Sequence, residues 1–585
     1  MATTSTTDGK TVRGPSMRIL KRDTTHAALR EVGGIESTPA KRRKLMRLGS
    51  GVGLGYYAMR YLRLKTPRCH QRWYESFDAH RRLLFLAPRS HGKSITVGRV
   101  LVGHRILTNR NIRILIVSRT KGAASKTVRL VRQDFERNRR IIEDWTTDDA
   151  GGAFRDKGLP WTDSLFYVAR PKAARDPTLE CVGVGGSITG GRFDLIIIDD
   201  PEDDKSVLTA RQRQKTVDWL RGTILELLDT NGRVVVIGTK KHAGDLYATL
   251  EQDPTFALLR DQAFVEWPDL AKVQWVERED PETGRVVLED VVVPDDAGGK
   301  ALWPEKWPVK ELLKKYRSLG SVMFRRENQN EITDDGASPF RKGWLDAAKK
   351  RGARLGFLTR GWEPEKDRAH PRCEGLYVWQ SADCALNDDA EKAQEADSDY
   401  TVIQTWGLDW RTGHRTLLRM VRRRGLTQGE LMGLLESEAA LFPQSLALVI
   451  EANAFQKLII AGLRKSTALP IQKHVTDKKK HSYFEGVPAM SVDYENGKIT
   501  LPTGRPAELG PGEEDPRVLV DTLCQELHGV GKETHDDTVM CAWIGDVWIR
   551  RFIIAEEHRR KTFKQKCDWR PQKPGQPDRF IPLAA

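Results

Sequence analysis

Cysteine is scarce in this chain, with 7 cysteines in 585 residues. They are scattered and odd in number, which excludes a disulfide framework and favours reduced thiols. His370 and Cys373 have the local spacing of a zinc site, but no second pair is evident, so we interpret them as loop residues. No run of eighteen or more apolar residues is present, which excludes a transmembrane helix. Residues 1–8 lack the basic and apolar regions of a signal peptide, and no internal repeat is evident.

Acidic residues are outnumbered by basic ones, 80 against 96, which gives a net charge of +16. Such an excess favours a polyanionic partner, most often nucleic acid. A basic protein without such a ligand is the alternative. The run Lys41–Lys44 looks like a nuclear signal, although a solvated basic face is the simpler interpretation.

The length predicts more than one domain. We expect a partly disordered basic segment over 1–60, a first domain over 61–300, a helical hinge over 301–365, a second domain over 366–556 and a flexible basic tail over 557–585. A surface hairpin is expected over 278–300, a Gly-, Pro- and charge-rich stretch over 351–373, and a helix over 535–553.

Short apolar runs alternate with amphipathic stretches in both domains. Continuous apolar runs of this length are typical of buried parallel strands, and strands that alternate with helices predict an α/β fold with a doubly wound sheet. In the first domain the strands are predicted at 83–86, 112–117, 195–198 and 234–237, with helices near 121–141 and 207–228. In the second domain they are predicted at 376–380, 400–407, 416–421 and 446–450.

The segment APRSHGKS follows the first of these strands and precedes a helical stretch. It fits the P-loop (Walker A) pattern G-x-x-x-x-G-K-[ST], except that Ala87 replaces the first glycine. In such a loop, backbone N–H groups and a helix N-terminus bind phosphates. The nucleotide-binding residues would be Ala87, Arg89, His91, Gly92, Lys93 and Ser94, with Lys93 on the β- and γ-phosphates of ATP and the Ser94 hydroxyl on Mg²⁺.

A Walker B pattern, FDLIIIDDP, lies about a hundred residues further on. A buried strand delivers carboxylates at its C-terminal edge, where ligands of open α/β sheets bind. Asp199 would hold Mg²⁺, and Asp200 would act as the general base that orients the attacking water, with Glu202 as the rival for that role. Thr239, after the next strand, would sense the γ-phosphate. Phosphoryl transfer also needs positive charge at the transition state, for which Arg89 and Arg192 are the candidates.

These motifs in this order, with VSRTKGAASKTV, GGSITGGRFDLIIIDDP, VIGTKKHAGDL and LWPEKWPVKELLKKYRSLGSVMFRRENQN, resemble the large terminase subunit of tailed bacteriophages. The resemblance covers roughly residues 65–550, and an arginine inside the P-loop, here Arg89, is typical of that family. It implies a packaging motor with an ATPase half and a nuclease half.

Three carboxylates mark the second half: Asp383 and Glu451 at strand ends, and Asp536 before a helix. Acids so placed predict an RNase H-like nuclease with two Mg²⁺ or Mn²⁺ ions, because hard cations prefer oxygen ligands. The resemblance implies the same trio as metal ligands, with Asp537 as a second ligand or close alternative. The loop Asn387–Asp397 is longer and more acidic than the family's, which makes Asp399 a possible extra ligand. The basic runs Arg422–Arg424 and Lys478–His481 would contact DNA or form solvated faces.

The motifs therefore predict an enzyme that hydrolyses ATP and cuts nucleic acid, and the resemblance implies that it moves double-stranded viral DNA into a procapsid and cuts concatemeric DNA. The resemblance implies a portal protein and a small terminase subunit as partners, a homo-oligomeric ring, commonly a pentamer, and a place in the bacterial host's cytoplasm with transient docking on the procapsid and no membrane association. One rival is a helicase-like or DNA-remodelling ATPase with a non-catalytic RNase H-like domain. Another is a nucleic-acid-binding scaffold with relic motifs.

Overall fold

The computed structural model describes residues 38–170, 175–188, 191–207, 209–332, 338–358, 376–385, 399–451, 456–476, 478–483, 485–504, 514–530 and 536–567. Our expectations for residues 1–37, His370, Cys373, the loop Asn387–Asp397 and the tail beyond Cys567 lie outside these ranges. Within them, no helix combines the length and apolar character needed to cross a bilayer.

The chain divides into two compact units. Unit one contains the described residues up to Leu83, Gly92–Pro201 and Thr223–Ile237, and unit two contains Leu84–His91, Glu202–Gly222 and the described residues from Gly238 on. These limits differ from the domain limits expected from the sequence, because the loop after the first strand and the segments 202–222 and 238–300 fall in unit two. Each unit is described by itself.

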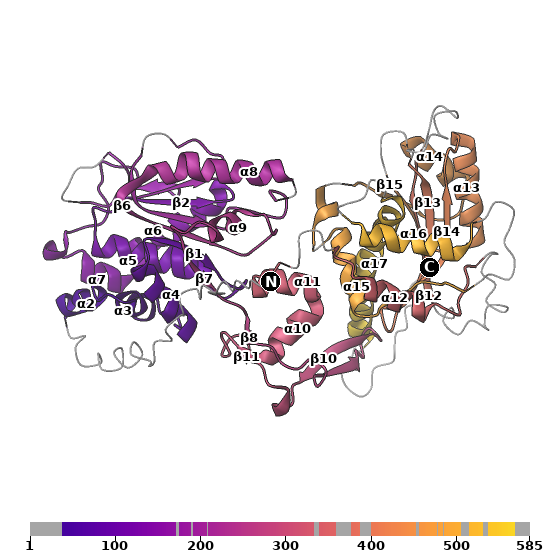
Figure 1. Ribbon diagram of the computed structural model, residues 1–585, viewed down its shortest axis with the longest axis horizontal. Coiled ribbons are helices and arrows are strands. Elements are labelled where there is room, and N and C mark those ends of the chain that lie inside the picture. The colour runs from indigo at the N-terminus through magenta and orange to yellow at the C-terminus, as the bar shows by residue number, and fades with distance from the viewer. Residues whose placement is uncertain are drawn as a thin grey trace, which may run out of the picture. The chain divides into compact units, whose positions relative to one another are not determined.

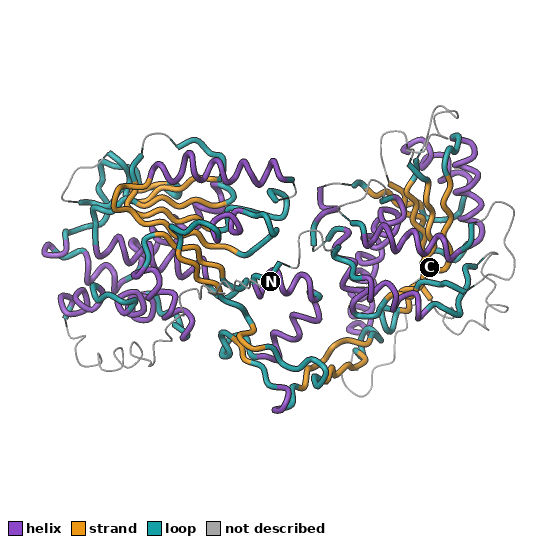
Figure 2. Tube along the Cα trace, in the orientation of Figure 1, coloured by secondary structure: helices purple, strands orange, loops and turns teal. Residues whose placement is uncertain are grey.

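The first sheet has seven strands in the order β3-β4-β2-β5-β6-β1-β7, and Figure 2 shows its strands side by side. The central pairs β2–β4, β2–β5 and β5–β6 are parallel, and β3 pairs with β4 in the antiparallel sense. The strands are β1 (Arg82–Leu86), β2 (Ile114–Ser118), β3 (Leu165–Phe166), β4 (Leu179–Gly183), β5 (Phe193–Asp199), β6 (Leu228–Gly238) and β7 (Ala257–Arg260). The parallel α/β sheet expected from the apolar runs is confirmed.

Helices of unit one surround these strands. Helix α6 packs on β2 and β4 and shields their apolar side chains. The helices are α2 (Pro39–Met46), α3 (Val52–Tyr56), α4 (Arg68–Ala79), α5 (Val102–Thr108), α6 (Lys121–Arg137) and α7 (Arg139–Trp145), with π-helical turns η2 (Tyr57–Tyr61) and η3 (Ile95–Leu101).

The basic run Lys41–Lys44 lies in α2 and is not simply a solvated face. The Arg42 guanidinium binds Asp144 of α7, with its Nε 2.7 Å from the carboxylate. Arg43 is buried, donates to the Asp144 carbonyl at 2.6 Å and pairs with Asp149. These contacts order a part of the segment that we expected from the sequence to be partly disordered.

Unit two begins its helices with α8 (Ala210–Trp219) and α9 (Leu246–Glu251). The expected hairpin is formed by β9 (Gln274–Glu279) and β10 (Val286–Val292), which pair in the antiparallel sense, and β8 (Phe264–Glu266) pairs with β11 (Lys300–Ala301). The helices that follow are α10 (Val309–Leu319), α11 (Ser321–Gln329) and α12 (Lys342–Arg351).

The second sheet has the order β16-β15-β12-β13-β14-β17. Strands β12, β13 and β14 are antiparallel neighbours, whereas β15 runs parallel to β12, and β16 parallel to β15. This is the mixed sheet of an RNase H-like fold, as the sequence predicted. The strands are β12 (Leu376–Asp383), β13 (Thr401–Asp409), β14 (Arg415–Arg423), β15 (Leu448–Glu451), β16 (Ile471–His474) and β17 (Ile499–Thr500).

The helix expected at 535–553 is α17 (Asp537–Cys567), which packs along β12 and β13 (Figure 1). It continues about four turns beyond the expected end because ion pairs hold its polar second half: Glu556 with Arg559 and Arg560, and Glu557 with Arg285 of the hairpin segment. The other helices of this part are α13 (Gln428–Leu441), α14 (Gln456–Ser466), α15 (Ser491–Glu495) and α16 (Pro516–His528). Trp379, Trp406, Leu523 and Trp543 belong to the core between the sheet and these helices.

Candidate active sites

The loop after β1 turns tightly. Ser90 and Gly92 have φ of 67° and 88°, in the left-handed region that favours glycine. Ala87 is fully buried and is not among the positive-φ residues, so the position does not need the glycine of the pattern. The His91 ring is buried and stacks on Trp307 with centroids 6.1 Å apart, while Lys306 donates to the Ser90 carbonyl at 2.8 Å. These contacts hold the loop in shape.

In unit one the end of this loop meets the end of β5. The Ser94 hydroxyl donates to the Asp199 carboxylate at 3.1 Å, and the Lys93 ammonium lies 3.4 Å from the Asp200 carboxylate. The two motifs, about a hundred residues apart in sequence, are thus brought together. Because parallel strands present their carboxyl ends at one edge, this is where an α/β sheet binds ligands.

Asp199 lies in a strongly perturbed electrostatic setting. Burial and the neighbouring Asp200 charge raise the pKa of Asp199 to about 7, and Lys93 and the Ser94 hydroxyl offset only part of this rise. A divalent cation would relieve that excess of buried negative charge. The hydroxyl and carboxylate oxygens of Ser94 and Asp199 are ligands that Mg²⁺ accepts, so the residues present fit the ion.

Asp200 and Glu202, the two rivals for the general base, differ in what they contact. Asp200 has a left-handed backbone, φ 44°, and a side chain that is 45% exposed. Glu202 is buried, and its carboxylate accepts the Leu246 N–H at 2.9 Å, at the start of α9. The positive φ and the exposure of Asp200 are features often found at functional sites, and the Glu202 carboxylate contacts the start of α9.

Arg89 lies beside a buried carboxylate that the sequence reasoning missed. The Glu327 side chain is 2% exposed, and its oxygens lie 3.5 Å from Arg89 Nη1 and 2.6 Å from Lys241 Nζ. Arg89 also donates its backbone N–H to the Glu327 carbonyl at 2.9 Å. Burial alone would raise the pKa of Glu327, but Lys241, Arg326 and Arg89 together lower it to about 2. The sequence feature that could have drawn attention to Glu327 is the polar run RRENQN. In the structure its last five residues, Arg326–Asn330, are all buried.

Thr239 and Arg192 are the other two residues predicted to act at the nucleotide site. Thr239 is buried directly after β6, where the Ala87 N–H meets the Gly238 carbonyl at 3.4 Å. Arg192 is exposed, and its guanidinium donates to the Glu226 carbonyl. The nearby Asp194 is bound by Arg113 at 2.9 Å.

Four carboxylates gather in the RNase H-like part of unit two. Asp383 and Glu451 end the parallel neighbours β12 and β15, in which Ala382 pairs with Ile450. Asp536 is exposed directly before α17, and Asp537, the first residue of that helix, is buried and accepts the Tyr400 N–H at 3.1 Å. Asp399 is exposed, and it is its neighbour Tyr400 that reaches Asp537.

Burial and mutual repulsion both disfavour the charged form of Asp383 in this acidic site. Burial raises the pKa of Asp383 well above its ordinary value, and Glu451, Asp537 and Asp536 raise it further. Among the described residues, no three His, Cys, Asp or Glu side chains converge closely enough to hold a metal ion as they stand. The all-oxygen donor set and its uncompensated negative potential nevertheless fit hard divalent cations, which would draw these carboxylates together.

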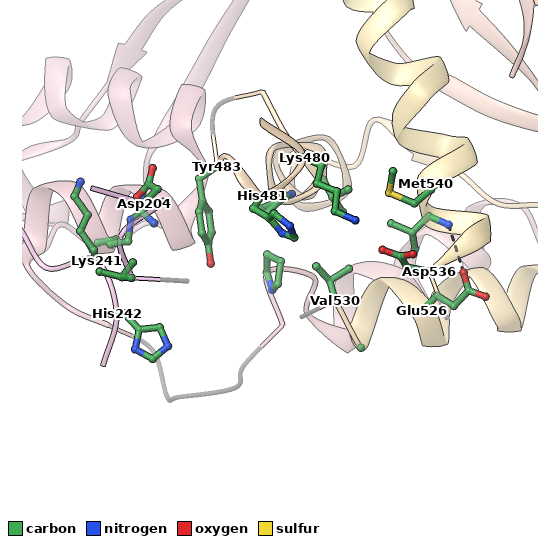
Figure 3. A pocket seen from close by; sticks show the side chains of 17 residues that line it. Asp204, Lys241, His242, Lys480, His481, Tyr483, Glu526, Val530, Asp536 and Met540 are labelled. Atoms are coloured by element: carbon green, nitrogen blue, oxygen red, sulfur yellow. Dashed lines mark hydrogen bonds and ion pairs between the residues drawn. The ribbon is translucent and has the colours of Figure 1, made fainter. Parts of the chain in front are cut away.

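Glu526 is a further acid of this site that the sequence reasoning did not select. It is buried, and its carboxylate accepts the Thr538 N–H at 2.9 Å and the Thr538 hydroxyl, which caps the start of α17. Figure 3 shows it beside Asp536 and Met540 at the start of the helix. Its role is to fix the helix end that carries Asp536 and Asp537.

Fold and site together define an α/β chain with a P-loop-type site and an acidic RNase H-like site. A stretch of 107 residues is 32% identical to the large terminase subunit of Enterobacteria phage T3 and covers 18% of this chain and 17% of the length of that relative. No family model matches the chain. The chain is thus similar to a terminase large subunit, which confirms the resemblance predicted from the motifs.

Solved structures that resemble the chain are also large terminases. The large terminase of one thermophilic bacteriophage is 10% identical, with a TM-score of 0.35, over 74% of this chain and 87% of its own. The bacteriophage HK97 large terminase is 11% identical, with a TM-score of 0.31, over 77% of this chain and 90% of its own. The large terminase nuclease of thermophilic phage G20c, with bound magnesium, is 17% identical, with a TM-score of 0.24, over 36% of this chain and 97% of its own.

Proposed function

We propose that this chain is a DNA-packaging ATPase and nuclease, the large subunit of a phage terminase. The observation that carries the proposal is the presence in one chain of two clusters of the expected chemistry: the Lys93–Asp200 and Ser94–Asp199 pairs, and the four carboxylates of the RNase H-like sheet. Its substrates would be ATP and double-stranded viral DNA.

At the first site, Lys93 would bind the β- and γ-phosphates of ATP, while Ser94 and Asp199 would hold one Mg²⁺. The bound cation supplies positive charge to the phosphate oxygens. Asp200 would take the proton of the attacking water, a role that its exposed side chain supports better than the helix-capping contact of Glu202 supports the alternative.

Two arginines remain candidates for the charge that phosphoryl transfer requires. Arg89 sits inside the P-loop and would reach the γ-phosphate of its own site. Arg192 would act on a neighbouring subunit of the ring, where its exposure would serve it. Thr239 would sense the γ-phosphate.

At the second site, Asp383, Glu451 and Asp536, with Asp537 as a further ligand, would hold two Mg²⁺ or Mn²⁺ ions. Such ions, when bound, activate water and stabilise the leaving oxygen of a phosphodiester. The protein's own part is to hold the carboxylates at one sheet edge, to keep α17 capped through Glu526, and to bind DNA with its excess of positive charge.

The resemblance further supports assembly into a ring, commonly a pentamer, on the portal of a procapsid, with a small terminase subunit for DNA recognition and the host cytoplasm as the setting. The alternative is a helicase-like or DNA-remodelling ATPase in which the RNase H-like part only binds.

The test is cleavage of a supercoiled plasmid by the purified protein with Mg²⁺ or Mn²⁺, beside Asp383→Ala and the matched control Asp399→Ala. We expect cleavage by the wild type and the control and its loss in Asp383→Ala. A wild type that hydrolyses ATP but leaves the plasmid intact at low salt would favour the alternative.

A further inference from the structure

Two arginines at the end of β14 lie against one aromatic ring. The guanidinium carbons of Arg422 and Arg424 are 3.3 and 4.1 Å from the centre of the Tyr400 ring. Arginine stacks on aromatic faces because its planar cation is attracted by the negative face of the ring. Such stacking orients both guanidinium groups while leaving their edges able to donate hydrogen bonds.

The sheet register places Arg422 on the same face as the acidic residue Asp383. Asp383 pairs with Val402 of β13, and Val402 pairs with Arg422 of β14, so the three side chains form one row on one face. Two strand spacings, about 10 Å, separate the ends of that row. Arg423 pairs with Thr401 and therefore projects from the opposite face.

Tyr400 is tied directly to the acidic site. Its backbone N–H donates to the Asp537 carboxylate at 3.1 Å, and Asp537 begins α17. The same helix start is capped by Glu526, whose Oε2 accepts the Thr538 N–H. The ring that carries the two arginines is thus held by the element that carries the acids.

The two arginines are not engaged as other arginines of their strand are. Arg419 binds Glu438 through two hydrogen bonds of 2.8 and 2.9 Å, and Arg415 pairs with Asp493 and Asp546. The Nε atoms of Arg422 and Arg424 are buried without a hydrogen-bond partner in the described part of the chain, as is that of Arg415, so the difference lies in the carboxylates that Arg415 and Arg419 bind. Each Nε is covered by the protein, so a phosphate that binds from outside would be held by the Nη groups of the two arginines.

We infer that Arg422 and Arg424 bind a backbone phosphate of the DNA strand that is cut, with Tyr400 as their positioning residue. The inference rests on the proposed nuclease function. A phosphate offers the bidentate acceptor geometry that a planar guanidinium matches. The backbones of Asp383 and Arg422 are about two strand spacings apart, so we place the bound phosphate beside the scissile one.

The test measures cleavage of a short DNA duplex by the full-length protein carrying Arg422→Gln, Arg424→Gln or the matched control Arg423→Gln. The loss of a charge-assisted hydrogen bond should raise KM by about 10-fold or more for the first two variants, with kcat changed by less than about threefold. The control removes the same charge from the same strand and should leave KM unchanged. Arg422→Lys should recover only part of the loss, because lysine neither stacks nor binds in a bidentate manner.

The phosphate itself is located by substituting neutral methylphosphonates one at a time beside the cleavage site. In the wild type one neighbouring substitution should raise KM about as much as Arg422→Gln does, and in Arg422→Gln that substitution should have no further effect. Equal effects of all three arginine variants, or additive effects of the variant and the methylphosphonate at every position, would overturn the inference.

A measurement of DNA affinity tests this inference independently of the nuclease proposal. The affinity for the same duplex is measured with Ca²⁺ in place of Mg²⁺, and each of the two variants should lower the slope of log affinity against log salt by about 0.9. Absence of cleavage in the wild type would refute the nuclease proposal alone. Unchanged affinity and salt slope in Arg422→Gln and Arg424→Gln would refute the phosphate site even if the wild type cuts DNA. Tyr400→Phe keeps the ring and should behave as the wild type, and thermal unfolding of each variant identifies any loss that comes from misfolding.

Discussion

Replacement of Glu327 by glutamine tests how strongly one buried carboxylate organises the cations around the P-loop arginine. Its oxygens lie 2.6 Å from Lys241, 3.1 Å from Arg326 and 3.5 Å from Arg89. The pKa of Glu327 is about 2 against an ordinary value of 4.5, and at 1.36 kcal/mol per pKa unit this corresponds to about 3 kcal/mol. The side chain is 2% exposed, so solvent screening does not reduce this value.

The direction of the pH dependence of stability follows from the lowered pKa of Glu327. A carboxyl group whose folded-state pKa lies below its unfolded value contributes stability above about pH 4.5, and the contribution is lost as the pH falls through about 2. Glu327→Gln should therefore destabilise α11 by about 3 kcal/mol at pH 7. The difference from the wild type should shrink as the pH approaches 3.

Amide hydrogen exchange of peptides that cover α11 measures this local stability. Exchange should be roughly 100-fold faster in Glu327→Gln at pH 7, since 1.4 kcal/mol corresponds to a factor of ten. The matched control is Glu331→Gln, which breaks the Arg325–Glu331 pair of 2.8 Å between side chains that are 39% and 33% exposed. Exposed pairs contribute about 0–1 kcal/mol, so this control should change exchange far less. Equal effects of the two variants would refute the reasoning.

Three further predictions concern unit one and the ATPase site. Burial, with Arg105 nearby, lowers the pKa of His104 to about 4. Between about pH 6.5 and 4 the unfolded state therefore binds a proton that the folded state does not, and the wild type should lose about 3 kcal/mol of stability as the pH falls through this range. Urea unfolding at several pH values should show that His104→Gln lacks this pH dependence. Lys93→Ala should reduce ATP hydrolysis at least about 100-fold in a phosphate-release assay while plasmid cleavage persists, and loss of both activities would contradict two separate sites. Asp200→Asn should lower ATP hydrolysis by about 100-fold or more, whereas Glu202→Gln should mainly cost about 1 kcal/mol of stability through its helix cap; the reverse ranking would make Glu202 the base.

The acids at strand ends could be predicted because the strands themselves are unmistakable. The runs LIII and VVVI are continuous and apolar, as buried parallel strands require, so the residues that follow them must lie at the carboxyl edge of the sheet. The strands β4 and β16 escaped notice because LECVG and IQKH mix polar and apolar residues. Periodicity alone does not distinguish such strands from loops.

Contacts between segments that are distant in the chain could not be predicted from the sequence. Glu327 meets Arg89 across 238 positions of the chain, and Tyr400 meets Asp537 across 137. Neither pair has a local pattern, since each depends on how sheets and helices pack. The same holds for the end of α17, where Glu557 binds Arg285 across 272 positions and the helix continues past the point at which its apolar pattern fades.

Helix α17 has a mechanical consequence. Its first residue is Asp537, and twenty residues later Glu557 binds Arg285, while Arg560 donates to the Thr283 carbonyl beside the hairpin of β9 and β10. Twenty helical residues form a lever of about 30 Å. A tilt of about 2° at the hairpin end would displace the other end by about 1 Å, more than the roughly 0.5 Å within which catalytic groups must be held. A displacement of the hairpin would thus change the position of the acidic residues at the start of α17.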